Sequence, residues 1–498
     1  MTGQNEYFGS ITLKILVYHS IVHQHREVGP AIDHLAINGM RMTLLLGWRG
    51  PSADEAADHY AALGIDVLRV PHELAYDDPN APSHQAQIAP PEAPDVGSGG
   101  PSRWRQGIRR LLGFVIALRS AAKTRRYAEH LLMHTTPDII IIGTDHSCGR
   151  CHNALKRAAQ KQGIPCVSIP YSSLLSTAIA ERSVFYRLKY GMVAPQLRAD
   201  HGVTNRIFSH LAPSWTREKG GVRLFRFDPL NTLAARLYGL VDLDPWQNPS
   251  HDIDLYLAPT DHAMRLLAES GFPMDKVKLV GMPRLDKVAG KLATVGLRSE
   301  LLNGLGIPDD ASFILWNMEP GWEHGYRSVT EHWSQVKAIA ASLRDTRMPV
   351  VISLHPLCHH SDYEFIEETP DFVISRNSAI HDLLPFSALV ISYLCSTNII
   401  ASIFGKKSII FDPKRYVAED GESVGDHRVP GSEVVHSLEE LANAITNAAA
   451  HFHGRDVQPA LLSDYRPACH AIQTTIVALM EARRVSTGQF KPTTPDNA

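Results

Sequence analysis

Polar residues that can bind phosphate follow two apolar runs in the second half of the chain. His355 comes directly after the apolar run 350–354, and Ser396, Thr397 and Asn398 follow a second such run just before a helix. An imidazole, hydroxyl groups and the backbone N–H groups at the start of a helix are suited to phosphate oxygens. The pattern predicts a diphosphate site formed by these four residues. Helix capping by Ser396 and Thr397, and a structural histidine at 355, are the alternative interpretations.

A second candidate lies in the first half of the chain. Residues 138–142 hold four consecutive isoleucines, the pattern of a strand buried on both faces of a sheet, and Asp145 and His146 follow them before the next helix. In an open α/β sheet, ligands bind where the strands end. Asp145 is therefore a candidate for a catalytic carboxylate and His146 for a substrate contact. Capping of the following helix is the competing role for Asp145.

Histidines also follow the first apolar run. His19, His23 and His25 precede Gly29, where we expect the next helix to begin, so they are placed in a loop that contacts substrate. Their spacing of four and two residues could also seat a metal, but no acidic residue lies closer to them than Glu27 or Asp33. The segment 148–152, CGRCH, matches the attachment pattern for c-type haem, but no export signal and no second CxxC accompany it. The sequence therefore predicts no metal and no haem.

Apolar runs alternate with helical patterns along the whole chain, which predicts βαβ units with parallel strands. The expected fold class is α/β, with two doubly wound, Rossmann-like domains that face each other across a cleft. We expect an N-terminal domain over residues 1–285 and a C-terminal domain over 286–485. The first would carry a mobile loop at 77–102 and an excursion at 214–248 that shapes the cleft, and residues 486–498 would form a disordered tail.

Composition excludes several classes of protein. The 498 residues carry 49 Lys and Arg against 52 Asp and Glu, a net charge of −3, which argues against a nucleic-acid binder. No apolar run reaches the ~20 residues of a membrane span, and the N-terminus lacks the pattern of a secretory signal, so a cytoplasmic protein is expected. The stretch 103–127 is basic and amphipathic. It packs on the sheet in one interpretation and lies on the inner face of an anionic membrane in the other.

The second half also resembles a known family. The order of its motifs is similar to the C-terminal half of GT-B enzymes, and closest to the group of CDP-glycerol glycerophosphotransferases, capsular polysaccharide transferases and UDP-N-acetylglucosamine 2-epimerases. The resemblance covers about residues 253–413. It rests on a G-x-P-R-x-D turn, on a His-Pro after a strand, and on a polar segment that opens a helix ending in Gly-Lys. The residues that match are Gly281, Pro283, Arg284, Asp286, His355, Pro356, Ser396, Gly405 and Lys406.

This resemblance implies a glycosyltransferase that moves a sugar from a nucleotide-activated donor to a glycan or glycoconjugate acceptor, as in bacterial surface polysaccharide synthesis. Transfer of a polyol phosphate in place of a sugar is an alternative reaction. It implies donor binding by Arg284 together with the diphosphate residues, an acceptor side with His19, His23 and His146, catalytic roles for Asp145 and His355, and neither metal nor cofactor. The glutamates that an epimerase needs are absent, and Tyr393 and Cys395 replace the usual Asp and Ser or Gly. A 2-epimerase-like enzyme and a non-catalytic nucleotide-sugar-binding protein are the alternatives.

Overall fold

The computed structural model describes most of the chain. The described residues are 12–20, 22–77, 103–143, 150–170, 197–247, 249–292, 296–322, 327–355, 358–376, 378–393, 397–413, 431–452 and 465–486, with the single positions 181, 184 and 395. The predicted loop at 77–102 lies outside this set except for its first residue, and the predicted tail lies outside it after residue 486. No described helix is long and apolar enough to cross a bilayer.

The first sheet is parallel and has seven strands in the order β11-β10-β7-β6-β1-β2-β4. Consecutive strands run outward from β1 on one side and from β6 on the other, so the order reverses between β1 and β6. The strands are β1 (Lys14–His19), β2 (Arg41–Leu46), β4 (Asp66–Arg69), β6 (Ile139–Ile142), β7 (Cys166–Ser168), β10 (Leu255–Ala258) and β11 (Val277–Leu279). Two short strands, β3 (Trp48–Arg49) and β5 (Tyr76–Asp77), pair beside it.

The second sheet repeats this scheme with six parallel strands in the order β14-β13-β12-β15-β16-β17, and its order reverses between β12 and β15. This is the strand order of a Rossmann sheet. Its strands are β12 (Ile314–Met318), β13 (Val350–Leu354), β14 (Phe372–Ile374), β15 (Leu389–Ser392), β16 (Lys407–Phe411) and β17 (Ser432–Val435). The predicted α/β class with two doubly wound sheets is confirmed. The edge strand β17 is an addition that the sequence did not indicate.

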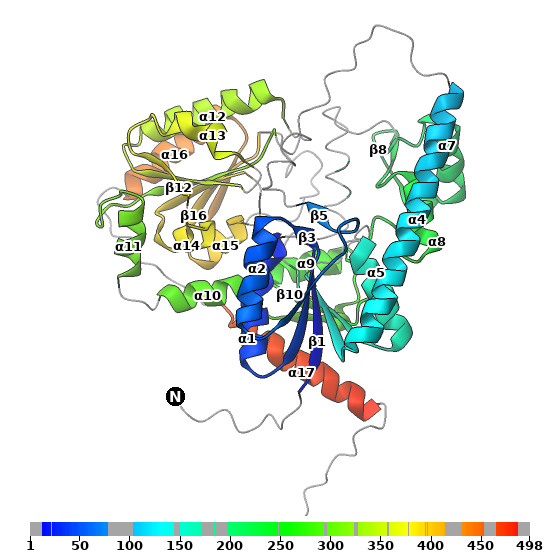
Figure 1. The fold of residues 1–498 in the computed structure, drawn as a ribbon. Helices are drawn as coiled ribbons and strands as arrows, with labels where there is room; N and C mark the ends of the chain where they lie inside the picture. The colour runs from blue at the N-terminus through cyan, green and yellow to red at the C-terminus, as the bar shows by residue number, and fades with distance from the viewer. Residues whose placement is uncertain are drawn as a thin grey trace, which may run out of the picture.

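Helices cover both faces of each sheet (Figure 1). The first sheet is flanked by α1 (Val22–Ile37), α2 (Pro51–Ala62), α4 (Arg103–Thr135), α5 (Arg150–Gln162), α9 (Asp261–Glu269) and α17 (Ala468–Ser486). Helix α10 (Pro283–Leu292) lies between the two sheets: it contacts α1, and its buried residues Leu285 and Val288 belong to a core of the second sheet. The second carries α11 (Leu297–Gly304), α12 (Val329–Arg344), α13 (His360–Tyr363), α14 (Ile380–Leu383), α15 (Thr397–Ile403) and α16 (Leu438–Phe452). Each sheet therefore has one apolar core on either face.

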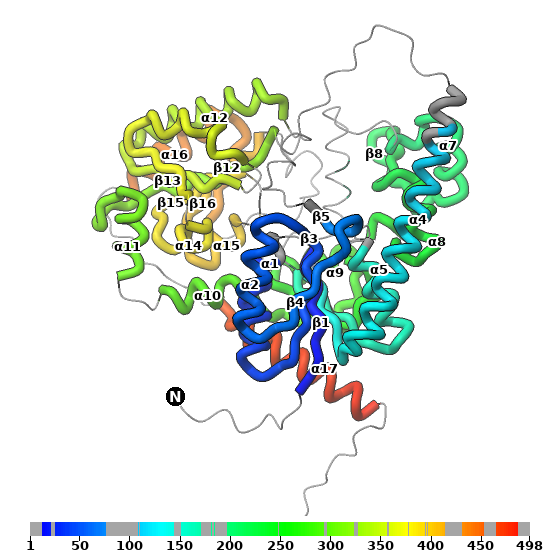
Figure 2. Tube along the Cα trace, in the orientation of Figure 1, coloured from blue at the N-terminus to red at the C-terminus, as the bar shows by residue number. Residues whose placement is uncertain are grey.

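The excursion predicted at 214–248 packs beside α4 at one side of the first domain (Figure 2). It contains the antiparallel pair β8 (Thr216–Lys219) and β9 (Val222–Phe225) and the helix α8 (Pro229–Leu237), and α7 (Gly202–Leu211) precedes it. Buried Lys156 of α5 anchors the segment after α8, because its ammonium group donates to Ser250 Oγ at 2.5 Å and lies 3.7 Å from Asp242 Oδ1.

Helix α17, the last helix among the described residues, returns from the second domain to the first. Side chains of α17, among them Ile472 and Ile476, belong to the core that also contains strand β1 and helix α1. His34 of α1 and Gln473 of α17 are joined by a hydrogen bond of 2.9 Å. The predicted division of the chain at 285/286 stays a prediction, and this helix is a feature that it did not include.

One predicted boundary is wrong. Helix α1 begins at Val22, seven residues before the expected start at Gly29. Gly29 instead lies inside the helix, where its missing side chain makes room for Tyr60, whose hydroxyl oxygen is 3.1 Å from the place of a Cβ. Pro30 is also inside the helix, which the buried residues Val28 and Ile32 hold against the sheet. His23 and His25 are therefore helical residues.

Candidate functional site

The candidate site lies where the central strands of the second sheet end. Met318 of β12 is paired in register with Leu354 of β13, and Asn317 with Ser392 of β15. The next residues along these strands, Glu319, His355 and Tyr393, therefore stand at one edge of the sheet, on strands that lie ~4.8 Å apart. This edge includes the point between β12 and β15 where the strand order reverses, the place where doubly wound sheets bind ligands.

A buried arginine adds a positive charge to this edge. Arg327 is 7% exposed, and its Nη2 donates to Glu319 Oε2 at 2.8 Å. The guanidinium carbon lies 4.0 Å from the centroid of the Tyr393 ring, a cation–π contact. Gly321 is required here, since a Cβ at this position would lie 2.6 Å from Arg327 Nη1. Ring, carboxylate and glycine together hold the guanidinium in one orientation.

Arg327 and Glu319 are the functional candidates that sequence reasoning missed. They stand in the connection between β12 and α12, and the contact with Tyr393 joins residues 66 positions apart. The sequence shows only that both residues follow the strand 314–318. That this strand lies at the reversal of the strand order is known from the sheet topology and not from any local motif.

Tyr393 and Cys395, which follow β15, are both neutral; Tyr393 is buried and Cys395 is half-buried. Burial raises the pKa of the Tyr393 hydroxyl, which donates to Gln335 Oε1 at 3.3 Å, and the ring packs 5.5 Å from that of Phe411. Burial also raises the pKa of the Cys395 thiol, whose Sγ accepts from Asn317 Nδ2 at 3.3 Å. A thiol held in its protonated form is a poor nucleophile. These two residues therefore add neither charge nor a nucleophile to this edge of the sheet.

A neutral histidine lies next to Arg327. His332 of α12 is buried, and its Nε2 forms a hydrogen bond of 2.9 Å with the hydroxyl of Tyr363. Burial, with a smaller contribution from the Arg327 guanidinium, lowers the pKa of His332 to about 4. The imidazole is therefore uncharged near neutral pH, and Arg327 is the nearby positive charge.

The predicted donor residues have distinct surroundings. His355 is half-buried at the end of β13, and its carbonyl accepts from the Cys358 N–H at 2.8 Å. Asn398 is fully buried: its Nδ2 donates to the Tyr393 carbonyl at 3.0 Å, and its Oδ1 accepts from the Ser392 hydroxyl. Asn398 thus holds the turn that carries Tyr393. Thr397 is the first residue of α15, and Ser396 lies outside the described residues.

The G-x-P-R-x-D turn connects the two domains. Gly281 has φ +98°, and a Cβ there would lie 2.8 Å from the Arg466 carbonyl oxygen. Asp286 accepts from the backbone N–H groups of Ala468 and Cys469 at 2.9 and 2.7 Å and from the hydroxyl of Tyr465 at 3.0 Å. The aspartate of the motif therefore caps α17.

Arg284 of the same motif pairs with a carboxylate of the second domain. Its Nη2 lies 3.5 Å from Asp382 Oδ2, and Lys291 lies 3.0 Å from the other oxygen of Asp382. This contact joins α10 to α14. Binding of the donor by Arg284 stays a prediction.

On the first sheet, His19 is the last residue of β1, next to the reversal between β1 and β6. It is 0% exposed, and among the described residues neither ring nitrogen has a hydrogen-bond partner. Burial, with a smaller contribution from His25, lowers the pKa of His19 to about 3. His23 lies in α1, and Asp145 and His146 lie outside the described residues, so their predicted roles stay predictions.

The remaining sequence candidates fill structural positions. Cys151 and His152 of the CGRCH segment are buried in α5, and the His152 ring packs edge-on against Tyr18 at 4.7 Å between centroids. His25 forms a hydrogen bond of 2.9 Å with the Tyr60 hydroxyl. Among the described residues, no three His, Cys, Asp or Glu side chains are grouped as a metal site would require.

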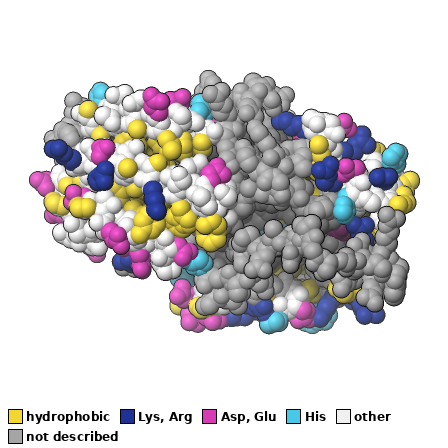
Figure 3. Space-filling view, turned by 90° about the horizontal axis from the view of Figure 1, so that it is seen from above, with side chains coloured by type: hydrophobic (Ala, Val, Ile, Leu, Met, Phe, Trp, Pro, Cys, Tyr) yellow, Lys and Arg dark blue, Asp and Glu magenta, His cyan; other side chains and the backbone are white. Residues whose placement is uncertain are grey.

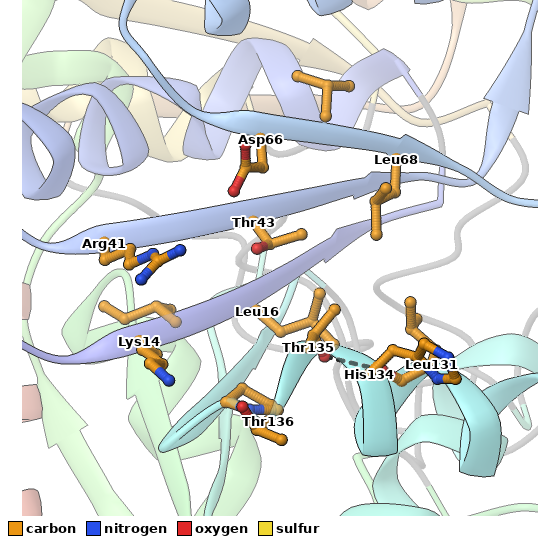
Figure 4. Close-up of a pocket in the computed structure, with 13 residues that line it drawn as sticks. Lys14, Leu16, Arg41, Thr43, Asp66, Leu68, Leu131, His134, Thr135 and Thr136 are labelled. Carbon is orange, nitrogen blue, oxygen red and sulfur yellow. Dashed lines mark hydrogen bonds between the residues drawn. The ribbon is translucent and has the colours of Figure 1, made fainter.

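A hollow of about 490 Å³ lies at the edge of the first sheet where the strands begin (Figure 4). Lys14, Arg41 and Asp66 at the starts of β1, β2 and β4 line it, together with Leu131 and His134 near the end of α4. Ligands of doubly wound sheets bind at the carboxyl ends of the strands, and this hollow is at their amino ends. We therefore place the functional site at the other edge.

No protein-family model matches the chain, and no curated protein matches its sequence. Among solved structures, it is similar to the UDP-GlcNAc 2-epimerase of Neisseria meningitidis bound to UDP-GlcNAc, at 14% identity and a TM-score of 0.49 over 94% of this chain and 100% of that one. It is also similar to the calicheamicin glycosyltransferase, at 15% identity and a TM-score of 0.47 over 95% and 99% of the two chains. At these values no residue role is transferred.

Proposed function

We propose that the chain is a glycosyltransferase. It transfers a sugar from a nucleotide-activated donor to a hydroxyl group of a glycan or glycoconjugate acceptor, without a metal or cofactor, in the synthesis of a bacterial surface polysaccharide. The observation that carries the proposal is the buried Arg327, held by Glu319 and Tyr393 at the carboxyl edge of the second sheet. The reaction takes place in the cytoplasm.

The donor binds with its diphosphate at this edge. A guanidinium is always charged and presents its N–H groups in a planar fork that matches phosphate oxygens. The contact with Glu319 orients the fork, and the strand register places His355 beside Glu319. Thr397 and the preceding residue, Ser396, add hydroxyl groups that bind the diphosphate. Arg284 is a further donor contact. The leaving diphosphate gains negative charge, so these groups stabilise the transition state more than the ground state.

The acceptor binds at the carboxyl edge of the first sheet. Asp145 follows β6 and serves as the general base, with His23 and His146 as further contacts on this side. His19 is neutral near pH 7 because its pKa is about 3. Such a weak base does not remove the proton of a hydroxyl group at neutral pH, so Asp145 is the candidate base on this side.

The acceptor hydroxyl gives its proton to the Asp145 carboxylate, and its oxygen forms a bond to the anomeric carbon of the sugar. The bond between that carbon and the phosphate oxygen breaks, and both electrons leave with the nucleotide. Arg327 and His355 stabilise the charge that develops on the leaving oxygen.

The test is a thermal-shift screen with UDP, GDP, CDP and CMP and with the sugars linked to them. A ligand that binds the native state raises the unfolding midpoint. Arg327→Lys keeps the charge but removes the planar fork. We therefore expect the active donor to raise the unfolding midpoint of this variant by only a small fraction of the rise in the wild type. Arg344→Lys, at an exposed pair with Asp345, is the matched control. The absence of a shift with any nucleotide, or equal shifts in both variants, would contradict the proposal.

A nucleotide-sugar-binding protein without catalysis is the second candidate. The observation that favours it is that Tyr393 and Cys395, both held in their neutral forms, stand in the segment where related enzymes carry other polar residues. Donor binding with no product in any acceptor mixture would identify this function. An epimerase must take a proton from carbon and return it, so it would exchange deuterium from D2O into the sugar, which a transferase does not do.

A further inference from the structure

Two helices beside the first sheet present apolar side chains to solvent. On α4 the exposed fractions run from 47% to 66%, and on α7 from 50% to 77%. The α7 residues are four apart, as are three of those on α4, so each helix carries a stripe on one face. The residues are Ile108, Leu111, Leu112 and Ile116 on α4 and Val203, Ile207 and Leu211 on α7. Apolar surface gathered in this way indicates a contact with something apolar.

The same face of α4 becomes basic towards the middle of the helix. Arg119, Lys123 and Arg126 continue the spacing of three and four from Ile116, and all three are exposed. Between residues 103 and 126 the sequence has eight Arg and Lys and no acid, and Glu129 is the one acidic residue of α4. Lys123 pairs with Glu73, and Arg125 with Glu129, so two of the eight charges are compensated by described partners.

The two helices are neighbours. A Cβ at Gly202, the first residue of α7, would lie 3.6 Å from Nη1 of Arg110 in α4. Figure 2 shows them side by side at the end of the first domain far from the second sheet. Helix α7 contains Arg206 and no acidic residue. In the view of Figure 3, Lys and Arg atoms gather at this end of the molecule.

We propose that the apolar stripes of α4 and α7, with Arg119 and Arg126, form a docking surface for an anionic lipid bilayer. Apolar side chains enter the boundary between headgroups and acyl chains, and flanking Arg and Lys pair with lipid phosphates. A second copy of the chain fits this surface less well, because a two-fold contact would bring two basic faces together. The surface goes beyond the proposed chemistry and does not depend on it.

The test is co-sedimentation of the full chain with vesicles, without any donor. We expect binding to vesicles of phosphatidylcholine with about 30% phosphatidylglycerol, at least tenfold weaker binding to phosphatidylcholine alone, and weakening by salt. Leu112→Ser with Ile116→Ser on α4, and Val203→Ser with Leu211→Ser on α7, should each weaken binding at least tenfold. Ile37→Ser with Val485→Ser removes equally exposed apolar groups elsewhere and is the control.

Three results would overturn the proposal. Absence of binding to either kind of vesicle would assign the surface to a protein partner. Binding that all variants and the control share would mean that lipids contact another face. A change in oligomeric state in the α4 and α7 variants, with vesicle binding intact, would assign the stripes to a contact between copies. Because no donor is present, these results are independent of the transferase test, and thermal melts of each variant confirm that it is folded.

Discussion

Asp286 should be a main determinant of how firmly α17 is attached to the first domain. Its carboxylate accepts three hydrogen bonds, two from backbone N–H groups at the start of α17 and one from Tyr465. A hydrogen bond to a charged group contributes about 1.5–3 kcal/mol, and the loss of an N-cap costs about 1 kcal/mol. The three contacts share one carboxylate and are not additive. Asp286→Ala should therefore weaken the attachment of α17 by about 2–4 kcal/mol.

Hydrogen exchange measured by mass spectrometry is the assay, because it reports local opening of α17 separately from unfolding of the second domain. A loss of about 2–4 kcal/mol in the free energy that holds α17 closed corresponds to roughly 30-fold to 1,000-fold faster exchange in peptides of residues 468–486. Asp286→Asn keeps an acceptor for the cap and should change exchange much less. Asp345→Ala, at an exposed ion pair, is the control. Exchange in Asp286→Ala within threefold of wild type would refute the capping role.

Three further outcomes are expected. His355→Ala should weaken donor binding in titration calorimetry by ~1.5–3 kcal/mol, the contribution of a hydrogen bond to a charged group, and unchanged affinity would remove His355 from the site. Asp145→Asn should reduce turnover by ~10²-fold at an unchanged melting temperature, since asparagine can cap a helix but cannot act as a base, and near-normal turnover would be inconsistent with that role. The folded-state pKa of His19, about 3, lies below its ordinary 6.5, so the unfolded chain takes up this proton first. The free energy of unfolding should then fall as pH decreases from 6.5 towards 3, by about 2 kcal/mol from this group between pH 7 and 5. In urea titrations, His19→Asn should reduce that dependence, and an identical dependence in the variant would show that the proton is taken up elsewhere.

Much of the fold could be predicted from the sequence because the strands are buried on both faces. The run Ile139–Ile142 is continuous and apolar, and the strand in the structure begins one residue after the predicted range 138–142. The start of α1 was missed because Gly29 and Pro30 are usual at helix ends. Packing against Tyr60 overrides that local preference.

The site was predictable only where a motif is local. The position of His355 followed from the strand before it, and the structure has the residue at that sheet edge. Arg327 could not be predicted, because its partners Glu319 and Tyr393 come from connections after different strands. The role of Asp286 was hidden for the same reason, since the helix that it caps begins at Ala468.

The return of α17 to the first sheet has a consequence for how the protein is made. Ile472 and Ile476 belong to the same core as β1, so the first domain lacks part of its own interior when residue 285 leaves the ribosome. At ~5–20 residues per second, the remaining stretch of about 200 residues takes roughly 10–40 s to synthesise. The second domain can fold in that interval, while the apolar face of α1 that packs against α17 is still uncovered. The first domain is thus synthesised first, and its core is completed last.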